Sequence, residues 1–256
     1  MPASQFPAGG SPLHGAIARL EAHVVRDRAL VRQAQALRYR VLAEDIGHHP
    51  TGAGVQLDED RFDSHCEHLV VRDIAADRLV ATYRLLAPDA ARRAGSYAAE
   101  DLFELGLLGV LRGRMVELGG VCVHPAYRCA AVSHLLWSSL ARYLLERGHD
   151  YVLGCVTLGL ADGGHAAASI YRHAASAAQS PDDLRALAYR PLPLERLRDS
   201  LPAKPPALLA SLMGRGAWVC GEPGLARDFA RAELPLLLPL ARMRTRNARQ
   251  FLADAA

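Results

Sequence analysis

Apolar and polar residues recur along the chain in two periods, one typical of strands and the other typical of helices. Residues 21–26 alternate as a strand, and from Asp27 to Gly47 the apolar positions recur at the spacing of one helix face. Residues 68–74 and 78–86 are rich in β-branched residues and are separated by a short turn, which predicts a hairpin. We therefore expect the fold to begin with a strand, a helix and two paired strands.

The rest of the chain continues this alternation. We predict, in order, a loop at 88–95, a helix at 97–111, a strand at 114–123 that ends at His124-Pro125, a helix at 130–147, a strand at 151–159 and a helix at 164–175. From about residue 200, a C-terminal α-β-β-α extension is predicted, with strands at 217–223 and 233–240 and a tail helix. This order predicts an α/β fold, in which helices cover both faces of a mixed sheet.

The N-terminal residues differ from the rest. Residues 1–18 lack the basic and apolar regions of a signal peptide, so we expect a disordered lead before one domain at 19–256. No uninterrupted apolar run approaches the ~20 residues that cross a bilayer. We expect a cytoplasmic protein and leave peripheral contact with the inner membrane open.

Charge and cysteine content exclude several classes of protein. Lys and Arg number 30 and Asp and Glu number 27, a balance that does not indicate a nucleic-acid binder. The five cysteines form no CxxC pair, so neither a disulfide framework nor a zinc finger is indicated. His65, Cys66 and His68 form a short cluster, but His65 and His68 point to opposite faces of an extended segment, and we expect no metal site there.

The connection from the strand at 114–123 to the following helix could bind an anion. Backbone N–H groups from Arg128 to Ser133 lack helical partners and can point at a phosphate. Arg128 adds a charge and Ser133 a hydroxyl group. Phosphate-bearing ligands bind at this place in sheets of this type. An ordinary strand-to-helix turn is the alternative.

Glu117 lies in the middle of a predicted strand, between Val116 and Leu118. Burying a carboxylate between apolar neighbours is costly unless it is used or paired. Burial would also raise its pKa towards the range of a base that accepts a proton from an ammonium group. The alternatives are a solvent-facing glutamate or an ion pair with Arg114.

Four charged residues could bind an amino-acid acceptor. Asp60 and Asp63 flank Phe62 and could bind cationic amino groups, although an acidic loop paired with neighbouring arginines is the ordinary explanation. Arg84, in the second hairpin strand, and Arg38, on the first helix, could bind a carboxylate or this aspartate pair. A solvated helix surface is the alternative for Arg38.

Several stretches together resemble the GNAT acyltransferase superfamily. Val123-His124-Pro125-x-Tyr127-Arg128, followed by an amphipathic helix, resembles its pantetheine-binding motif. LDEDRFDSHCEHLVV, VATYRLL and the stretch at 206–243 resemble the hemolysin-like branch, notably the ornithine-acyl-carrier-protein N-acyltransferases. A more distant likeness is to acyl-homoserine-lactone synthases. The resemblance covers about residues 25–252 and implies a GNAT fold.

The resemblance also implies a reaction and its residues. A fatty acyl group, 3-hydroxylated, would pass from acyl carrier protein to the α-amine of ornithine, giving a lyso-ornithine lipid. Glu117 would assist deprotonation of the amine, and Tyr171 would protonate the leaving thiolate. The acceptor would bind to Arg38, Asp60, Asp63 and Arg84, and the pantetheine arm to Val121, Val123, Arg128, Ala131, Val132 and Ser133. No tightly bound cofactor is implied; acyl-ACP, or acyl-CoA, is the co-substrate.

The chain departs from the family pattern at two places. The loop from Arg128 to Ser133 has no glycine, whereas glycines let the backbone wrap around the pyrophosphate of coenzyme A. A less open loop fits the single phosphate of carrier-protein pantetheine. Gly120 replaces an arginine of the family, so the role of that arginine is vacant or is taken by Arg84 or Arg38.

Other functions remain open at this point. One is a synthase of acyl-homoserine-lactone type or of another N-acyl amino acid, and another is a non-catalytic scaffold that binds acyl carrier protein or lipid. Tail arginines could dock an acidic carrier protein or anionic lipids, or form a solvated face; they are Arg242, Arg244, Arg246 and Arg249. The apolar segments at 97–111 and 130–147 could line an acyl-chain tunnel.

Overall fold

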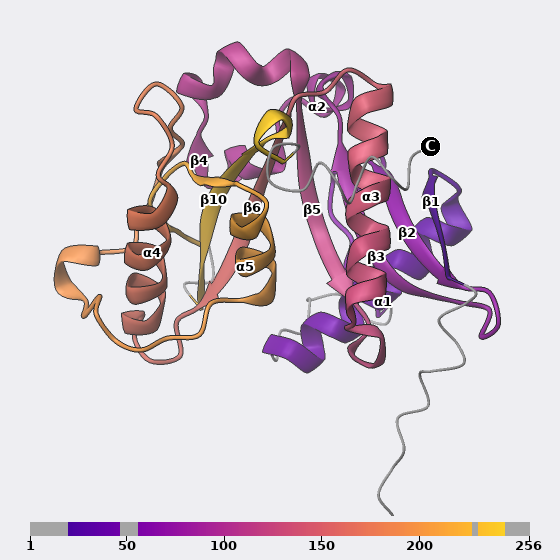
Figure 1. Ribbon diagram of the computed structural model, residues 1–256, viewed down its shortest axis with the longest axis horizontal. Helices are drawn as coiled ribbons and strands as arrows, with labels where there is room; N and C mark the ends of the chain where they lie inside the picture. The colour runs from indigo at the N-terminus through magenta and orange to yellow at the C-terminus, as the bar shows by residue number, and fades with distance from the viewer. Residues whose placement is uncertain (1–19, 47–55, 227–229, 244–256) are drawn as a thin grey trace, which may run out of the picture.

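A computed structural model describes residues 20–46, 56–226 and 230–243. Its centre is an eight-stranded mixed sheet in the order β1-β2-β3-β5-β6-β10-β8, with β9 paired to β10 (Figure 1). The strands are β1 (Leu20–Val25), β2 (Glu67–Asp73), β3 (Arg78–Leu86), β5 (Met115–Val123), β6 (Tyr151–Gly159), β8 (Trp218–Val219), β9 (Gly224–Leu225) and β10 (Arg231–Pro239). A second, small sheet pairs β4 (Phe103–Glu104) with β7 (Leu187–Ala188). The predicted mixed sheet is confirmed.

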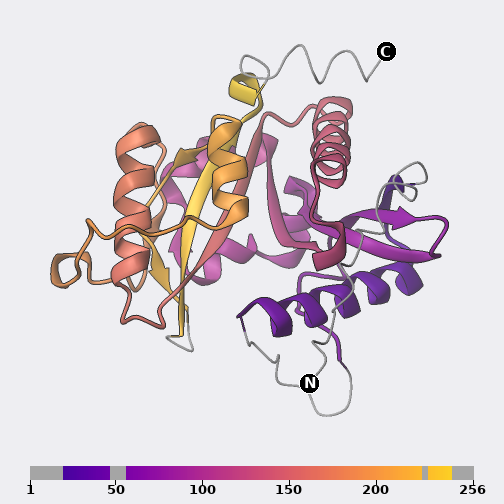
Figure 2. The same cartoon turned by 60° about the horizontal axis from the view of Figure 1, so that its bottom comes forward.

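Helices cover both faces of this sheet. The α-helices are α1 (Arg28–Ile46), α2 (Pro88–Ala94), α3 (Ala130–Glu146), α4 (His165–Ala178) and α5 (Ala207–Gly214). The 3₁₀-helices are η2 (Ala98–Asp101), η3 (Gly106–Arg114), η4 (Pro125–Tyr127) and η5 (Leu194–Arg196). α1, α2, η2 and η3 lie on one face, and α3, α4 and α5 lie on the other (Figures 1 and 2).

The largest hydrophobic core lies between the sheet and α3, α4 and α5. Trp137 of α3 is at its centre, with its ring centroid 6.0 Å from that of Tyr83. Its indole N–H donates to the Ser211 hydroxyl of α5 at 3.1 Å, so the one polar atom of the ring is satisfied. A second core lies under η2 and η3 and includes Leu108, Met115 and Leu153.

The predictions for two segments were wrong. The predicted loop at 88–95 is helix α2, with Pro88 in its first turn and Gly95 as a left-handed C-cap at φ 90°. Proline at the start and glycine at the end are the usual boundaries of a helix. The predicted helix at 97–111 is instead two 3₁₀-helices with β4 between them.

Four further expectations are changed or lie outside the described residues. The segments at 97–111 and 130–147 pack on opposite faces of the sheet, so they do not line one tunnel. The strand predicted at 217–223 shortens to β8. The lead at 1–18 and the tail from residue 244 lie outside the described residues. No helix in the described ranges is long and apolar enough to cross a membrane.

Candidate active site

Strands β5 and β6 separate in the middle of the sheet. They pair in parallel only from Met115–Tyr151 to Leu118–Gly154. Beyond that point β5 is paired only with β3, and β6 only with β10, within the described sheet. Figure 1 shows the two strands diverging towards the bottom of the view. We call the facing backbone edges, Gly119–Val123 and Cys155–Gly159, the strand separation.

Glu117 lies immediately before the strand separation and its side chain is buried, at 7% exposure. Its two carboxylate oxygens accept the backbone N–H groups of Ala98, at 2.6 Å, and Ala99, at 2.7 Å. These N–H groups belong to the first turn of η2, which has no helical acceptor for them. Burial raises the pKa of Glu117 to about 7, although the two N–H groups and Arg84 favour the charged form.

The alternatives predicted for Glu117 do not hold. The side chain is not on a solvent face, and Arg114 instead forms an ion pair with Asp150 at 2.5 Å. A buried carboxylate with a pKa near neutrality can exchange protons at physiological pH, which is what a general base requires.

A partly buried ionic cluster centred on Asp63 lies beside Glu117. Arg38 donates from Nη2 to Asp63 Oδ1 at 2.9 Å and from Nε to Asp58 Oδ2 at 2.7 Å. Arg84 Nη1 is 2.7 Å from Asp60 Oδ2 and 3.4 Å from Asp63 Oδ2. We call these five residues the Asp63 cluster. The structure therefore brings together all four predicted acceptor-binding residues.

Charge pairing decides the protonation states in the Asp63 cluster. Burial alone would raise the pKa of Asp63, but Arg38 and Arg84 hold it below the usual value. Burial would likewise lower the pKa of Arg84, but Asp60 and Asp63 raise it. Asp63 and Arg84 are therefore both charged at neutral pH. Asp60 remains accessible, with 47% of its side chain exposed.

Two residues border the cluster, and one of them is the position at which the chain departs from the family pattern. His68 is fully buried and its Nε2 lies 3.7 Å from Asp63 Oδ1; burial lowers its pKa, so it faces the cluster as a neutral ring. Gly120 has φ +54°, and a Cβ there would lie 2.9 Å from Arg38 Cδ. Arg38 therefore occupies the space beside the position where the family pattern has an arginine.

Sequence reasoning missed some members of this site. Asp58 was not predicted as a site residue. It belongs to the quoted LDEDRFD stretch, in which acidic residues lie on both sides of Phe62, and this pattern could have indicated it. The N–H groups of Ala98 and Ala99 have no sequence signature, because any non-proline residue supplies a backbone N–H. Cys66 also lies nearby, where burial raises the pKa of its thiol to about 12, so it stays protonated.

The loop after β5 is held by Tyr127, which is buried in η4. Its hydroxyl donates to Asp73 Oδ2 at 2.7 Å and lies 3.1 Å from Arg78 Nη2. Both partners belong to the β2–β3 hairpin. The N–H of His124 also donates to Val80 O at 2.8 Å. The hairpin thus fixes the position of the loop that leads into α3.

The N-terminus of α3 has fewer anion-binding donors than predicted. The N–H of Arg128 donates to Pro125 O, that of Cys129 to Tyr127 O, and that of Ser133 to Cys129 O. This leaves the N–H groups of Ala130, Ala131 and Val132, and no side chain caps them. Arg128 Nε donates to Val123 O at 3.2 Å, which places its guanidinium beside the end of β5.

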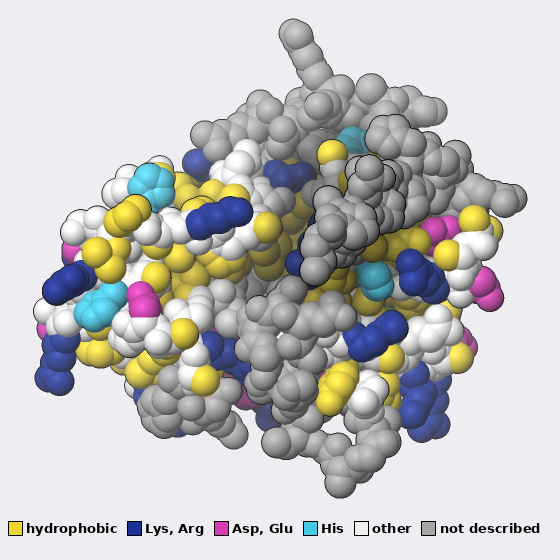
Figure 3. Space-filling model, turned by 90° about the horizontal axis from the view of Figure 1, so that it is seen from below, with side chains coloured by type: hydrophobic (Ala, Val, Ile, Leu, Met, Phe, Trp, Pro, Cys, Tyr) yellow, Lys and Arg dark blue, Asp and Glu magenta, His cyan; other side chains and the backbone are white. Residues whose placement is uncertain are grey.

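Figure 3 views the molecule from the side towards which β5 and β6 diverge. Apolar side chains form much of this surface, with arginine and histidine side chains around them. Val121 and Val123 are half-buried on the diverging part of β5. This side offers unpaired strand edges, apolar side chains and a helix N-terminus, one after another in space. An extended ligand with an anionic end could bind along them.

Tyr171 is not brought into the Asp63 cluster. It lies on α4, on the face of the sheet opposite to Glu117, and lines a pocket of about 460 Å³ with Leu192, Leu194 and Glu222. Burial, with a contribution from Glu222, raises the pKa of its hydroxyl. The lining of that pocket contains no residue of the Asp63 cluster or of the α3 N-terminus.

Comparison with known proteins shows the family of this chain. Residues 37–138 match the acetyltransferase (GNAT) domain family. The L-ornithine Nα-acyltransferase of Rhizobium meliloti (strain 1021) is 33% identical over 97% of this chain and 89% of its own length. That of Agrobacterium fabrum (strain C58) is 30% identical over 94% of this chain and 87% of its own. The chain belongs to the L-ornithine Nα-acyltransferase family. The predicted resemblance is confirmed.

Solved structures show the same fold outside this family. FeeM, an N-acyl amino acid synthase from uncultured soil microbes, aligns with a TM-score of 0.53 and 12% identity over 93% of this chain and 97% of its own. The CoA-dependent acyl-homoserine lactone synthase BjaI, solved with SAM and isopentyl-CoA, aligns with a TM-score of 0.52 and 13% identity, covering 90% and 88% of the two chains. At these identities the likeness shows the fold alone, which is that of the GNAT proteins.

Proposed function

We propose that this protein transfers a fatty acyl group from a pantetheine thioester to the α-amine of ornithine, forming an N-acylornithine. One observation carries the proposal: Glu117, with a pKa of about 7, lies where β5 and β6 separate and beside the Asp63 cluster. Family membership supports the reaction type and the acceptor, because the relatives are named L-ornithine Nα-acyltransferases.

In this reaction the ammonium group of the acceptor must lose two protons. Glu117, as the carboxylate, accepts one of them directly or through a water molecule, and the neutral amine attacks the thioester carbonyl. The C–N bond forms, the C–S bond breaks, and the thiolate takes up the other proton. Backbone N–H groups of the strand separation polarise the carbonyl oxygen as negative charge develops on it. Tyr171 was predicted to protonate the thiolate, but its place on the opposite face gives this role no support.

The Asp63 cluster supplies both charges that an amino acid requires. Asp60 is accessible and can bind the cationic side chain of ornithine. Arg38 Nη1 is buried and has no hydrogen-bond partner among the described residues, so it can donate to the acceptor carboxylate. Arg84 joins the two by contacting Asp60 and Asp63.

We propose acyl carrier protein as the donor, with acyl-CoA as the alternative. The strand separation fits the extended pantetheine arm, and the three N–H groups of Ala130, Ala131 and Val132 fit one phosphate. The side chains of Ala131 and Ser133 leave this turn less open than a glycine-rich loop around a pyrophosphate would be. We place the reaction in the cytoplasm, where acyl carrier protein and ornithine meet.

The test is to express the chain in a host that lacks ornithine lipids and to analyse the extracted lipids by mass spectrometry. New N-acylornithine is expected with the native sequence and none with Glu117→Gln, while Glu195→Gln, at an exposed glutamate, is the matched control. A different N-acyl amino acid would overturn the acceptor, and an acyl lactone would favour a synthase of homoserine-lactone type. Soluble protein that binds acyl carrier protein but produces no new lipid would indicate a binding scaffold.

A further inference from the structure

The outer side of η3 carries an apolar row that faces solvent. A 3₁₀-helix has about three residues per turn, so residues three apart lie in one line. In this nine-residue helix and the residue before it, Leu105 and Leu108 point inward and are 2% and 0% exposed. Leu107 and Val110 point outward and are 45% and 86% exposed. Val110 is the most exposed large hydrophobic side chain in the described part of the chain.

Two more exposed apolar side chains adjoin this row. The β4–β7 pairing places Leu187 opposite Glu104, two residues before η3, and Leu187 is 52% exposed. The N–H of Tyr189 donates to Leu102 O at 3.0 Å, and its side chain is 61% exposed. We call Leu107, Val110, Leu187 and Tyr189 the η3 surface. Scattered exposed hydrophobics are ordinary, but four joined through one small sheet and one helix are not.

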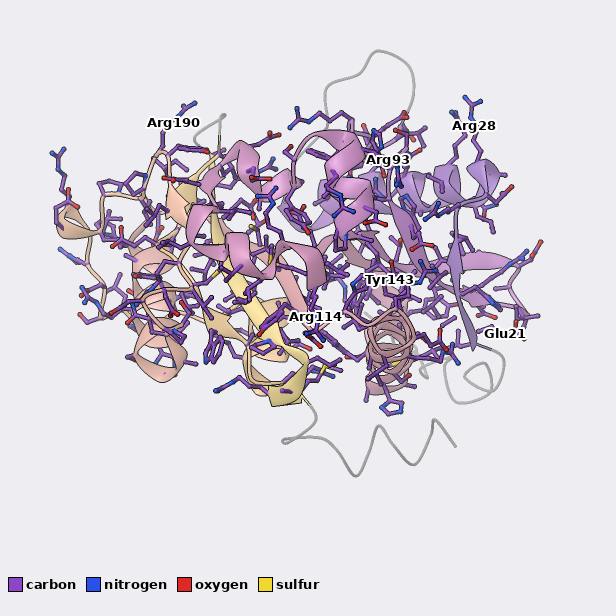
Figure 4. The ribbon with its side chains drawn as sticks, turned by 90° about the horizontal axis from the view of Figure 1, so that it is seen from above. Glu21, Arg28, Arg93, Arg114, Tyr143 and Arg190 are labelled. Atoms are coloured by element: carbon purple, nitrogen blue, oxygen red, sulfur yellow. The ribbon has the colours of Figure 1, made fainter. Side chains whose placement is uncertain are left out.

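Arginines border the η3 surface. Between Leu105 and Val116 the chain has Arg112 and Arg114 but no acidic residue. α2, which packs against η3, adds Arg92 and Arg93. Figure 4 looks onto this side of the molecule and shows Arg93 and Arg114 beside the two helices.

Two of these arginines, Arg93 and Arg114, are available to a negatively charged partner. Arg92 forms an ion pair with Asp89, and Arg112 forms one with Glu100. Arg93 is exposed, and no hydrogen bond or ion pair is recorded for it with any other described residue. Arg114 pairs with Asp150, but 66% of the arginine side chain and 37% of the aspartate side chain are exposed. An exposed ion pair of this kind contributes little and is easily exchanged for a phosphate.

We infer that the η3 surface docks on a lipid bilayer with anionic headgroups. Val110, Leu107 and Leu187 would enter the boundary between headgroups and acyl chains, and Tyr189 would lie at the headgroup level. Arg93 and Arg114 would contact phosphates. A bilayer suits this surface better than a protein, because glycines at 106, 109 and 113 flank the row and leave narrow, separate side chains. Such a row can insert into lipid but offers a protein little continuous area.

The inner side of the same segment strengthens this inference. Ala98 and Ala99, at the start of η2, hold Glu117, and the Tyr97 hydroxyl donates to Met115 O at 2.6 Å. The segment at 97–114 therefore separates the candidate active site from the η3 surface. Docking would place the bilayer against the layer that covers Glu117. The inference goes beyond the proposed reaction and does not depend on which amine is the acceptor.

Co-sedimentation of the purified full chain with vesicles tests this. The native sequence should bind vesicles of phosphatidylcholine and phosphatidylglycerol, and bind phosphatidylcholine vesicles more weakly. Val110→Asp should reduce the bound fraction about tenfold, because it places a charge where an apolar side chain would enter the interface. Arg93→Glu should reduce binding only where phosphatidylglycerol is present. Ile74→Asp is the matched control, at a 39% exposed residue in the β2–β3 turn, and should bind as the native sequence does.

Three outcomes would overturn the inference. The first is that the native chain does not bind either vesicle, or that Val110→Asp binds as well as the control. The second is that light scattering detects a dimer of the native chain and a monomer of Val110→Asp, which would assign the surface to a second copy. The third is binding of acyl carrier protein that Val110→Asp abolishes. Vesicle binding needs no turnover, so its failure is distinguishable from a failure of the proposed acyl transfer.

Discussion

The side chain of Arg38 occupies the space that a side chain at Gly120 would need. Gly120 has a left-handed φ of +54°, and a Cβ added there would lie 2.9 Å from Arg38 Cδ. Arg38 is itself 1% exposed and fixed by Asp58 and Asp63. An arginine from the first helix thus fills the space above the fifth strand, and glycine at 120 leaves room for it.

This arrangement predicts a coupled effect on stability. Gly120→Ala should lower the free energy of unfolding by about 1–2 kcal/mol for the left-handed conformation alone, and by more in the presence of Arg38. In an Arg38→Ala background the same change should cost only the conformational part. Chemical denaturation of the two single variants and the double variant gives this coupling. Gly119→Ala is the control, since its Cβ would lie 3.5 Å from the nearest atom and its φ is not positive. Additive effects would refute this arrangement.

From the raised pKa of Glu117 we predict opposite pH dependences for activity and stability. The carboxylate is the active base, so kcat/KM should rise with pH through about 7. Its pKa is raised from 4.5 in the folded state, so the folded protein binds the proton more tightly than the unfolded chain. Stability should therefore be greatest below pH 4.5 with respect to this group and fall as pH rises to 7, by about 3 kcal/mol in all.

Glu117→Gln separates these two effects. The amide cannot ionise, so the fall in unfolding free energy between pH 4.5 and 7 should be absent from the variant, and its activity should be lost at every pH. Denaturation curves across this pH range, recorded beside Glu195→Gln, supply the measurement. Parallel pH profiles for the native protein and Glu117→Gln would show that the carboxylate has an ordinary pKa.

Sequence patterns predicted which charged residues the fold brings together better than they predicted the elements around them. Asp60, Asp63 and Arg84 could be predicted to lie together, because charged residues close to predicted strands need partners. The segment from 97 was misassigned because its apolar residues fit a helix of either period. Its leucines at 102, 105, 108 and 111 recur at a spacing of three, which favours a 3₁₀-helix. The partners of Glu117 could not be predicted, because backbone N–H groups leave no mark on sequence.

Asp63 predicts a large loss of stability when its charge is removed. Asp63→Asn would leave the buried guanidinium of Arg38 with one carboxylate fewer, and removing one partner of a buried pair costs about 3–5 kcal/mol. The pKa of Asp63 is lowered in the folded state, so its contribution is present above its usual pKa of 3.8 and is lost as pH falls further. Thermal unfolding at neutral pH should show a much smaller loss for Asp60→Asn, at an accessible side chain. Equal losses would contradict the buried position of Asp63.

We predict that replacing Tyr127 weakens binding of the acyl donor and does not slow the chemical step. Tyr127→Phe removes the hydroxyl that joins the loop before α3 to Asp73 and Arg78, at a cost of about 1–2 kcal/mol in stability. The N–H groups proposed to hold the pantetheine phosphate then lose their fixed position, so KM for the acyl donor should rise about fivefold. KM for the amine and kcat should change little, because the Tyr127 hydroxyl bonds to Asp73 and Arg78 and not to Glu117 or the Asp63 cluster. Steady-state kinetics with each substrate varied in turn provide the measurement. If Tyr127→Phe lowered kcat and left the donor KM unchanged, the loop would act on the reaction itself and not on the donor.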